Sequence, residues 1–183
     1  YLPHHGTWLD GESHQKLWGR DATAIAEFIG WYLAEGSAHG RTKGRATALS
    51  VAQSKSANPE KQARITKVLE RCGFTWSENP SGFTVHKSSV PVPLFDLLAY
   101  SGVCDEKRIP PLCWSWSADL LNSLLTGLVM GDGNIHDDYP MDTAPKVVYY
   151  TTSRGLADDV QVMTLLVGLH ARIRHRVRVN AGG

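Results

Sequence analysis

The sequence predicts an α+β fold in which two similar halves pack through a central pair of apolar helices. Two observations lead to this prediction. Long apolar helical patterns occur at about 21–35 and 117–132, and a similar order of elements follows each of them. Each pattern begins after a plausible N-cap residue and ends at a glycine, as helices commonly do. The apolar residues surround both helices, so we expect them to be buried between other elements.

The first half continues with a strand and a second helix. A β-like run covers 46–54, and the next helix has Asn58 as its N-cap, Pro59 at its first position and Gly73 just past its end. The runs 74–79 and 82–88 predict a hairpin, and 92–100 predicts a short apolar helix.

The second half repeats this order, with a β-like run at 146–153 and a helix at about 153–168. The helix-end acids lie 97 positions apart (132 − 35 = 97) and the helix-end glycines lie 95 apart (168 − 73 = 95), which indicates an internal duplication. We expect an N-terminal extension or linker over 1–20, a first repeat over 21–104 and a second repeat over 105–183. The second repeat is expected to be truncated by a strand and a helix.

Small residues four positions apart explain how the central helices approach each other. Gly30 and Ala34 in one helix, and Gly127 and Gly131 in the other, make a flat stripe on one helix face. Glycine inside a helix costs about 1 kcal/mol relative to alanine, so close backbone contact is the expected reason for it. These four residues are predicted to form the helix interface.

Glu35 and Asp132 occupy the last turn of the two helices, where the helix dipole disfavours a carboxylate by about 0.3–1 kcal/mol. Pairing the helices also brings the two carboxylates together, so they must share a proton or a cation. A divalent metal ion relieves both costs and suits phosphodiester hydrolysis. One such acid alone would be an ordinary helix-end residue, but two in matched positions favour a metal site.

Basic residues cluster in two segments, although the net charge is only +1. Segment 41–71 holds eight basic residues against two acidic ones, and in 172–179 four arginines alternate with other residues. A strand would place those four on one face. A solvated sheet face is one interpretation, but a polyanion laid along the row would offset the repulsion between the guanidinium groups.

Several classes of protein are excluded. No run approaches the roughly 18 apolar residues of a spanning helix, and the first residues lack the order of a signal peptide. Three cysteines without CxxC spacing indicate neither a zinc site nor a disulfide framework. We expect a protein of the cytoplasm, or of the nucleoid or nucleus, that is not secreted.

Two segments of the sequence resemble a motif of a known family. The segment LTGLVMGDG (125–133) resembles the LAGLIDADG motif, and FIGWYLAEG (28–36) resembles its variant in endonuclease domains carried by inteins. The likeness to double-motif, DOD-type homing endonucleases runs from about residue 21 to the C-terminus. It implies a duplicated αββαββα fold with saddle-shaped antiparallel sheets, and a monomer with internal pseudo-twofold symmetry. It also implies that Glu35 and Asp132 bind Mg²⁺ (or Mn²⁺).

The resemblance extends to EKRIP (106–110), which implies that Lys107 is a catalytic lysine. The alternative is a solvated linker lysine before a proline turn. Gln53, at the end of a strand, is our candidate for a residue that positions water. The residues expected to bind DNA are Arg41, Lys43, Arg45, Lys55, Lys87, Arg172, Arg174, Arg176 and Arg178.

The sequence therefore predicts a site-specific, metal-dependent endonuclease acting on double-stranded DNA with a long asymmetric target site. A nucleic-acid-binding relative without cleavage is the alternative, either an RNA-splicing maturase or a degenerate intein endonuclease domain. A purely structural helical module is a third interpretation, but it leaves the duplicated acids unexplained.

Overall fold

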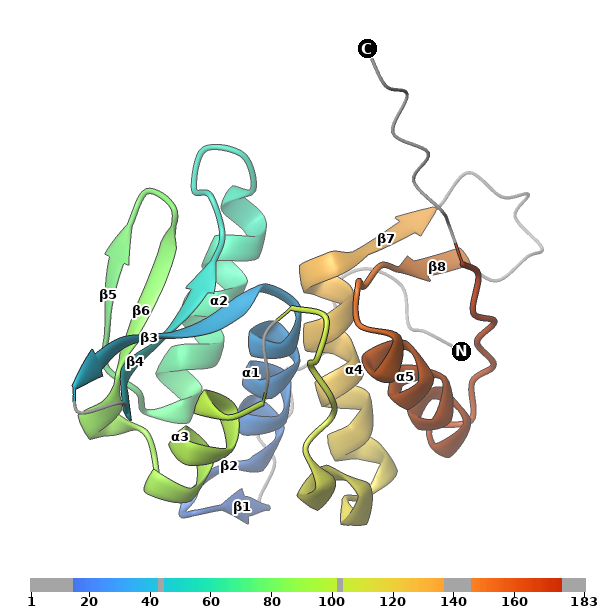
Figure 1. Cartoon of the computed structure of the whole chain (residues 1–183), viewed down its shortest axis with the longest axis horizontal. Coiled ribbons are helices and arrows are strands. Elements are labelled where there is room, and N and C mark those ends of the chain that lie inside the picture. Colours follow the sequence, from blue (N-terminus) through green and yellow to red (C-terminus); the bar gives the residue numbers. More distant parts are fainter. Residues whose placement is uncertain (1–14, 43–44, 102–103, 137–145, 176–183) are drawn as a thin grey trace.

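The computed structural model describes residues 15–42, 45–101, 104–136 and 146–175. Two helices, α1 (Ala22–Glu35) and α4 (Ala118–Asp132), lie side by side at its centre (Figure 1). One sheet and two helices flank α1, and a two-stranded sheet and one helix flank α4. The predicted α+β class with antiparallel sheets is confirmed.

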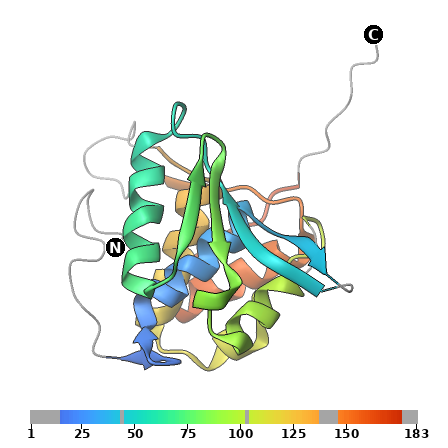
Figure 2. The same ribbon diagram turned by 90° about the vertical axis from the view of Figure 1, so that its left-hand side faces the viewer.

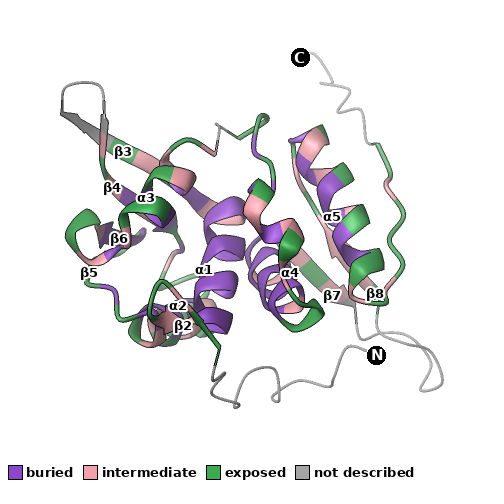
Figure 3. Ribbon diagram, turned by 90° about the horizontal axis from the view of Figure 1, so that it is seen from below, coloured by how far each residue is buried: buried purple, intermediate pink, exposed green. Residues whose placement is uncertain are grey.

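Helix α1 begins where the sequence predicts because Asp21 caps it. The carboxylate of Asp21 accepts hydrogen bonds from the backbone N–H groups of Thr23 (3.0 Å) and Ala24 (3.2 Å). A short hairpin of β1 (Lys16–Leu17) and β2 (Arg20–Asp21) leads into this cap. Burial of α1 extends from Ala22 to Leu33, so the helix is enclosed nearly all round, as expected from its apolar sequence (Figure 3).

The sheet beside α1 has four antiparallel strands in the order β3-β4-β6-β5. The strands are β3 (Gly36–Thr42), β4 (Arg45–Ala52), β5 (Trp76–Asn79) and β6 (Gly82–His86). Leu49, Val51, Phe83 and Val85 are buried on its inner face, and the strands lie in front of the helices in Figure 2. The predicted hairpin corresponds to β5 and β6.

Two helices complete this side of the molecule. Helix α2 (Pro59–Cys72) begins at Pro59 and ends at Gly73, whose φ of 65° is left-handed, as the sequence predicts. Helix α3 (Val92–Ala99) follows the short 3-10 turn η1 (Lys87–Ser89). A second 3-10 turn, η2 (Pro111–Ser115), precedes α4.

The other side of the molecule contains β7 (Gly133–His136), β8 (Lys146–Tyr149) and α5 (Arg154–Leu166). Ser153 caps α5 by accepting a hydrogen bond from the N–H of Leu156 (3.1 Å). Residues 171–175 form no strand. The expectation that Arg172 and Arg174 lie in a strand is therefore wrong, because the chain after α5 pairs with neither β7 nor β8 in that stretch. Arg176 and Arg178 lie outside the described residues.

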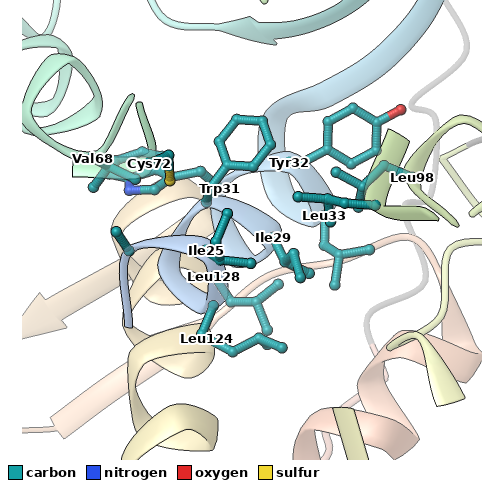
Figure 4. Packing of buried hydrophobic residues seen from close by; sticks show 14 of the residues in the cluster. Ile25, Ile29, Trp31, Tyr32, Leu33, Val68, Cys72, Leu98, Leu124 and Leu128 are labelled. Carbon is teal, nitrogen blue, oxygen red and sulfur yellow. The ribbon is translucent and has the colours of Figure 1, made fainter. Parts of the chain in front are cut away.

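The core lies between α1, α2, α4 and the inner face of the four-stranded sheet. Figure 4 shows Ile25 and Ile29 of α1 close to Leu124 and Leu128 of α4. Phe28 meets Phe74 edge to face, with ring centroids 5.2 Å apart. An ion pair joins the buried Glu27 of α1 to the partly buried Arg64 of α2, with Arg64 Nε donating to Glu27 Oε1 (2.6 Å). Among the described helices, none is long and apolar enough to cross a membrane.

Candidate active site at the paired helix ends

The close approach of α1 and α4 is a contact between two backbones. A Cβ at Gly30 would lie 2.9 Å from the Cα of Gly127, and a Cβ at Gly127 would lie 2.9 Å from the Cα of Gly30. The contact is reciprocal, since Gly30 faces the carbonyl oxygen of Leu124 while Gly127 faces that of Glu27. One turn further on, Gly131 meets the Cβ of Ala34. The structure thus places all four predicted interface residues in the contact.

Glu35 and Asp132 end the two helices on the same side of this contact. Each is followed by a glycine, Gly36 or Gly133, that starts a strand in extended conformation. Neither glycine is left-handed. Instead, a Cβ at Gly36 would collide with the ring and carbonyl of Tyr32, and one at Gly133 would collide with the carbonyl of Val129. The chain therefore leaves each helix through a turn too tight for a side chain.

The two carboxylates influence each other. Burial raises the pKa of Glu35, and the negative charge of Asp132 raises it further. Burial also raises the pKa of Asp132, while Lys107 and Lys61 oppose the shift in both acids. The site is therefore a half-buried acid pair flanked by two ammonium groups, and repulsion within the pair disfavours full ionisation.

Lys107 has an unexpected place in this arrangement, because it is 6% exposed rather than solvated. Its ammonium donates to the carbonyl oxygens of Tyr32 (3.2 Å), Leu33 (3.0 Å) and Gly36 (2.8 Å). A cation at a helix C-terminus satisfies carbonyls that lack partners and interacts favourably with the dipole. Lys107 is thus a cap of α1, and burial lowers its pKa while the charges of Asp132 and Glu35 oppose that shift.

The second half of the molecule fixes Lys107 from its backbone side. Ser153, at the start of α5, donates its hydroxyl to the carbonyl of Lys107 (2.7 Å). The neighbouring Arg108 forms two hydrogen bonds to Asp159 of α5 (2.7 and 2.6 Å). Lys107 therefore connects α5, through its backbone carbonyl, to the acid end of α1, through its ammonium group.

Lys61 is a site residue that the sequence analysis missed. It lies in the first turn of α2, is partly buried, and donates to the carbonyl oxygen of Gly131 in the last turn of α4 (2.9 Å). A lysine in the first turn of a helix is at the electropositive end, where the dipole disfavours it. Lys61 is therefore at an unfavourable end of its helix dipole, as Glu35 and Asp132 are at theirs. This unfavourable position is the sequence signal that could have identified Lys61 as a site residue.

Gln53 lies near the acid end of α1, because Val51, two residues before it, pairs with Gly36. It is 5% exposed, and its Oε1 accepts a hydrogen bond from Asn58 Nδ2 (2.8 Å). Near α4, Tyr149 occupies the position equivalent to Val51, because it pairs with Gly133. Burial raises the pKa of Tyr149, and the negative charges of Asp132 and Glu35 raise it further, so this phenol lies within electrostatic range of the acid pair. The sequence analysis did not identify it.

The predicted DNA-binding residues are dispersed. Lys55 forms an ion pair with Glu78 (2.8 Å), and the Lys87 ammonium lies 4.5 Å from the ring centroid of Phe95. Arg172 and Arg174 are exposed. Arg41 and Arg45 belong to β3 and β4, but their side chains, together with Lys43, lie outside what the structure describes.

The outer face of the four-stranded sheet carries a row of hydroxyl groups that the sequence analysis did not identify. Ser37 pairs with Ser50, Ser50 with Thr84, and Thr84 with Ser77, so the row crosses all four strands. Beside it, His86 Nε2 lies 2.8 Å from the Ser77 hydroxyl. Ser37 and Ser77 are exposed, and Ser50 and Thr84 are partly buried.

Metal binding is restricted by the donors available. In the part of the chain that the structure describes, no three His, Cys, Asp or Glu side chains gather in a way that could hold a metal ion. The acid pair supplies two carboxylates and neighbouring oxygen atoms. Mg²⁺ is commonly held by one or two carboxylates together with water and phosphate, so the donor set fits that ion when a phosphate ligand is present.

Part of the chain matches a known protein family. Residues 119–183 match the model of a LAGLIDADG-like domain. The match includes nearly all of α4, with Asp132 at its end, as well as β7, β8 and α5. No curated protein matches the chain. The domain match supports the LAGLIDADG family for the α4 side of the molecule.

Proposed function

We propose that this chain is a site-specific endonuclease that hydrolyses double-stranded DNA, in the manner of the double-motif, intein-associated homing endonucleases that its two motifs resemble. The observation that supports the proposal is the pairing of Glu35 and Asp132 at the joined ends of α1 and α4. In the metal-free protein, burial disfavours the ionised form of both carboxylates, and repulsion from Asp132 adds to this at Glu35. A cation bound between the carboxylates relieves that repulsion, so the geometry favours a metal site over a structural one.

Glu35 and Asp132 are the residues that would hold Mg²⁺ or Mn²⁺. When bound, such an ion supplies an activated water and neutralises charge on the phosphate. The protein orients its two ligands through the Gly30–Gly127 contact, because neither helix can shift without moving the other. Lys107 holds the carbonyls beside Glu35, and its ammonium places positive charge near the reacting phosphate. We assign Gln53 the accessory role of positioning water.

DNA contact is assigned to the outer face of the four-stranded sheet. Hydroxyl groups donate to and accept from base edges in the major groove, which admits a β-ribbon. The row from Ser37 to Ser77 would lie against the bases. Phosphates would be bound on the α4 side by Arg172 and Arg174. On the α1 side they would be bound by the other basic residues expected to contact DNA, which are Arg41, Lys43, Arg45, Lys55 and Lys87. In this proposal the two repeats, 21–104 and 105–183, contact different parts of one asymmetric site.

A second candidate is a nucleic-acid-binding relative that does not cleave, such as a maturase or a degenerate intein endonuclease domain. One observation favours it. An ammonium group has three donors, and Lys107 directs its ammonium at three backbone carbonyls of α1. A lysine engaged in this way serves the fold, and it contributes to cleavage only through its charge.

A cleavage assay separates the two candidates. The chain is incubated with Mg²⁺ and a plasmid library of candidate sites, alongside Glu35→Gln and Asp132→Asn. Both substitutions preserve size and remove charge, so we expect cutting to be abolished while DNA binding is retained. Asp119→Asn is the matched control, because Asp119 is an exposed acid in the first turn of α4. Normal cutting by Glu35→Gln and Asp132→Asn would exclude the mechanism, and binding without any cutting by the unaltered chain supports the non-cleaving relative.

A further inference from the structure

The last turn of α4 is held by three hydrogen bonds of different origin. The N–H of Gly133 donates to the carbonyl of Val129, and the N–H of Tyr150 donates to that of Asp132 (3.1 Å). The third is the bond from Lys61 to the carbonyl of Gly131 (2.9 Å). Only the Lys61 bond comes from outside the α4 side of the molecule, since Lys61 belongs to α2 beside the four-stranded sheet.

Lys61 therefore bridges the two sides at the position next to Asp132. Helix α4 has no basic residue in its own last turn, so its carbonyl end has no cation from within the helix. The α1 helix also lacks one, and Lys107 supplies it. Each helix end is thus capped by a lysine from another part of the chain. The two caps differ in origin, because Lys107 comes from the segment before α4 and Lys61 comes from α2.

We propose that Lys61 is a positioning residue that fixes the last turn of α4, and with it the direction in which Asp132 points relative to Glu35. Its ammonium touches the backbone at Gly131, one residue before Asp132, and makes no contact with a reacting group. Movement of α2 is transmitted through this bond to the acid pair. The inference rests on the proposed function only in taking Asp132 as a metal ligand.

Hydrogen exchange in the metal-free chain tests the positioning role directly. The amides of Gly133 and Tyr150 report on the last turn of α4, and the amide of Leu121, bonded to Ser117 (3.0 Å), reports on its first turn. In Lys61→Met we expect exchange at the two reporting amides to accelerate by about tenfold or more, as for loss of a hydrogen bond from a charged donor. Leu121 should stay unchanged, and Lys61→Arg should restore most of the protection.

Lys67→Met is the matched control, because Lys67 is an exposed lysine of the same helix. It removes the same charge from α2 without removing a contact to α4. Unchanged exchange at Gly133 and Tyr150 in Lys61→Met overturns the proposal. A parallel acceleration at Leu121 also overturns it, since that result indicates general destabilisation.

Binding of Tb³⁺ provides a second measurement, independent of cleavage. Removing a nearby positive charge should by itself strengthen cation binding. A weaker affinity in Lys61→Met, by about tenfold as for other outer partners of metal ligands, is therefore the signature of lost positioning. An affinity that is unchanged or stronger contradicts the proposal. If Asp132→Asn leaves Tb³⁺ binding intact, the proposed metal site fails instead, and the exchange experiment still decides the role of Lys61.

Discussion

Replacing Gly127 by alanine is expected to force the central helices apart. The new Cβ would fall on the carbonyl oxygen of Glu27, 2.8 Å from the backbone nitrogen of Trp31 and 2.9 Å from the Cα of Gly30. Unstrained contacts of carbon require about 3.5–4.0 Å, so the helices must separate by roughly 1 Å. All three atoms belong to the backbone, and no change of rotamer can relieve the contact.

The cost follows from that separation. Overpacking a core typically costs about 1–3 kcal/mol, and the gaps opened beside Leu124 and Leu128 add to this. The higher helix propensity of alanine returns about 1 kcal/mol. We therefore expect the free energy of unfolding to fall by about 2–3 kcal/mol. With a urea slope of about 2 kcal/mol/M, the unfolding midpoint should fall by roughly 1–1.5 M.

Circular dichroism during urea titration measures this change, and cleavage of the target site measures its functional consequence. A misplacement of about 1 Å in the acid pair is expected to lower the cleavage rate by about 100-fold. Ala63→Ser is the control, since Ala63 is an exposed residue of α2 and the change adds a similarly small group. If Gly127→Ala is as stable as the unaltered chain, the inference that backbone contact sets the helix spacing is wrong.

Two further predictions concern the charged groups of the site. Because burial and the charge of Asp132 raise the pKa of Glu35 above its ordinary value of 4.5, the folded metal-free protein binds this proton more tightly than the unfolded chain does. Its stability should therefore rise as pH falls through the raised pKa towards 4.5. Glu35→Gln should raise the melting temperature at pH 7 and flatten that dependence in thermal unfolding with a chelator present; a lower melting temperature at pH 7 contradicts the reasoning. Lys107→Met leaves three carbonyls of α1 without their donor and should lower the free energy of unfolding by about 2–4 kcal/mol in urea titration. A loss below about 0.5 kcal/mol, which is typical of surface substitutions, would show that water replaces the ammonium there.

Local signals in the sequence identified most of the fold. Asp21, Pro59 and Gly73 mark helix ends through chemistry confined to a few neighbouring residues, so their positions follow from the sequence alone. Glycine inside a helix at positions 30 and 127 is explained by the close approach of two helices. The two glycines therefore indicated which helix faces meet. The α+β order on the α1 side followed from the same signals.

Contacts between distant segments could not be predicted in this way. The bond between Lys61 and Gly131 joins residues on different sides of the molecule, and nothing in the sequence near Lys61 indicates its partner. Lys107 was interpreted through its motif, whereas its burial against α1 depends on how 104–110 crosses the helix end. The arginine alternation at 172–178 was consistent with a strand. A strand also needs a neighbour to pair with, however, and residues 171–175 have none.

The backbone contact at Gly30 and Gly127 has a consequence for how the two sides of the molecule can evolve. Because backbone atoms set the spacing at this contact, side chains that point away from it can change without altering the spacing of the helices. The equivalent positions 27 and 124 already differ, one being a glutamate paired with Arg64 and the other a leucine. Each side is thus free to change its chemistry independently while the seam keeps the two acids in register. A protein built in this way can acquire a different preference on each side without rebuilding its centre.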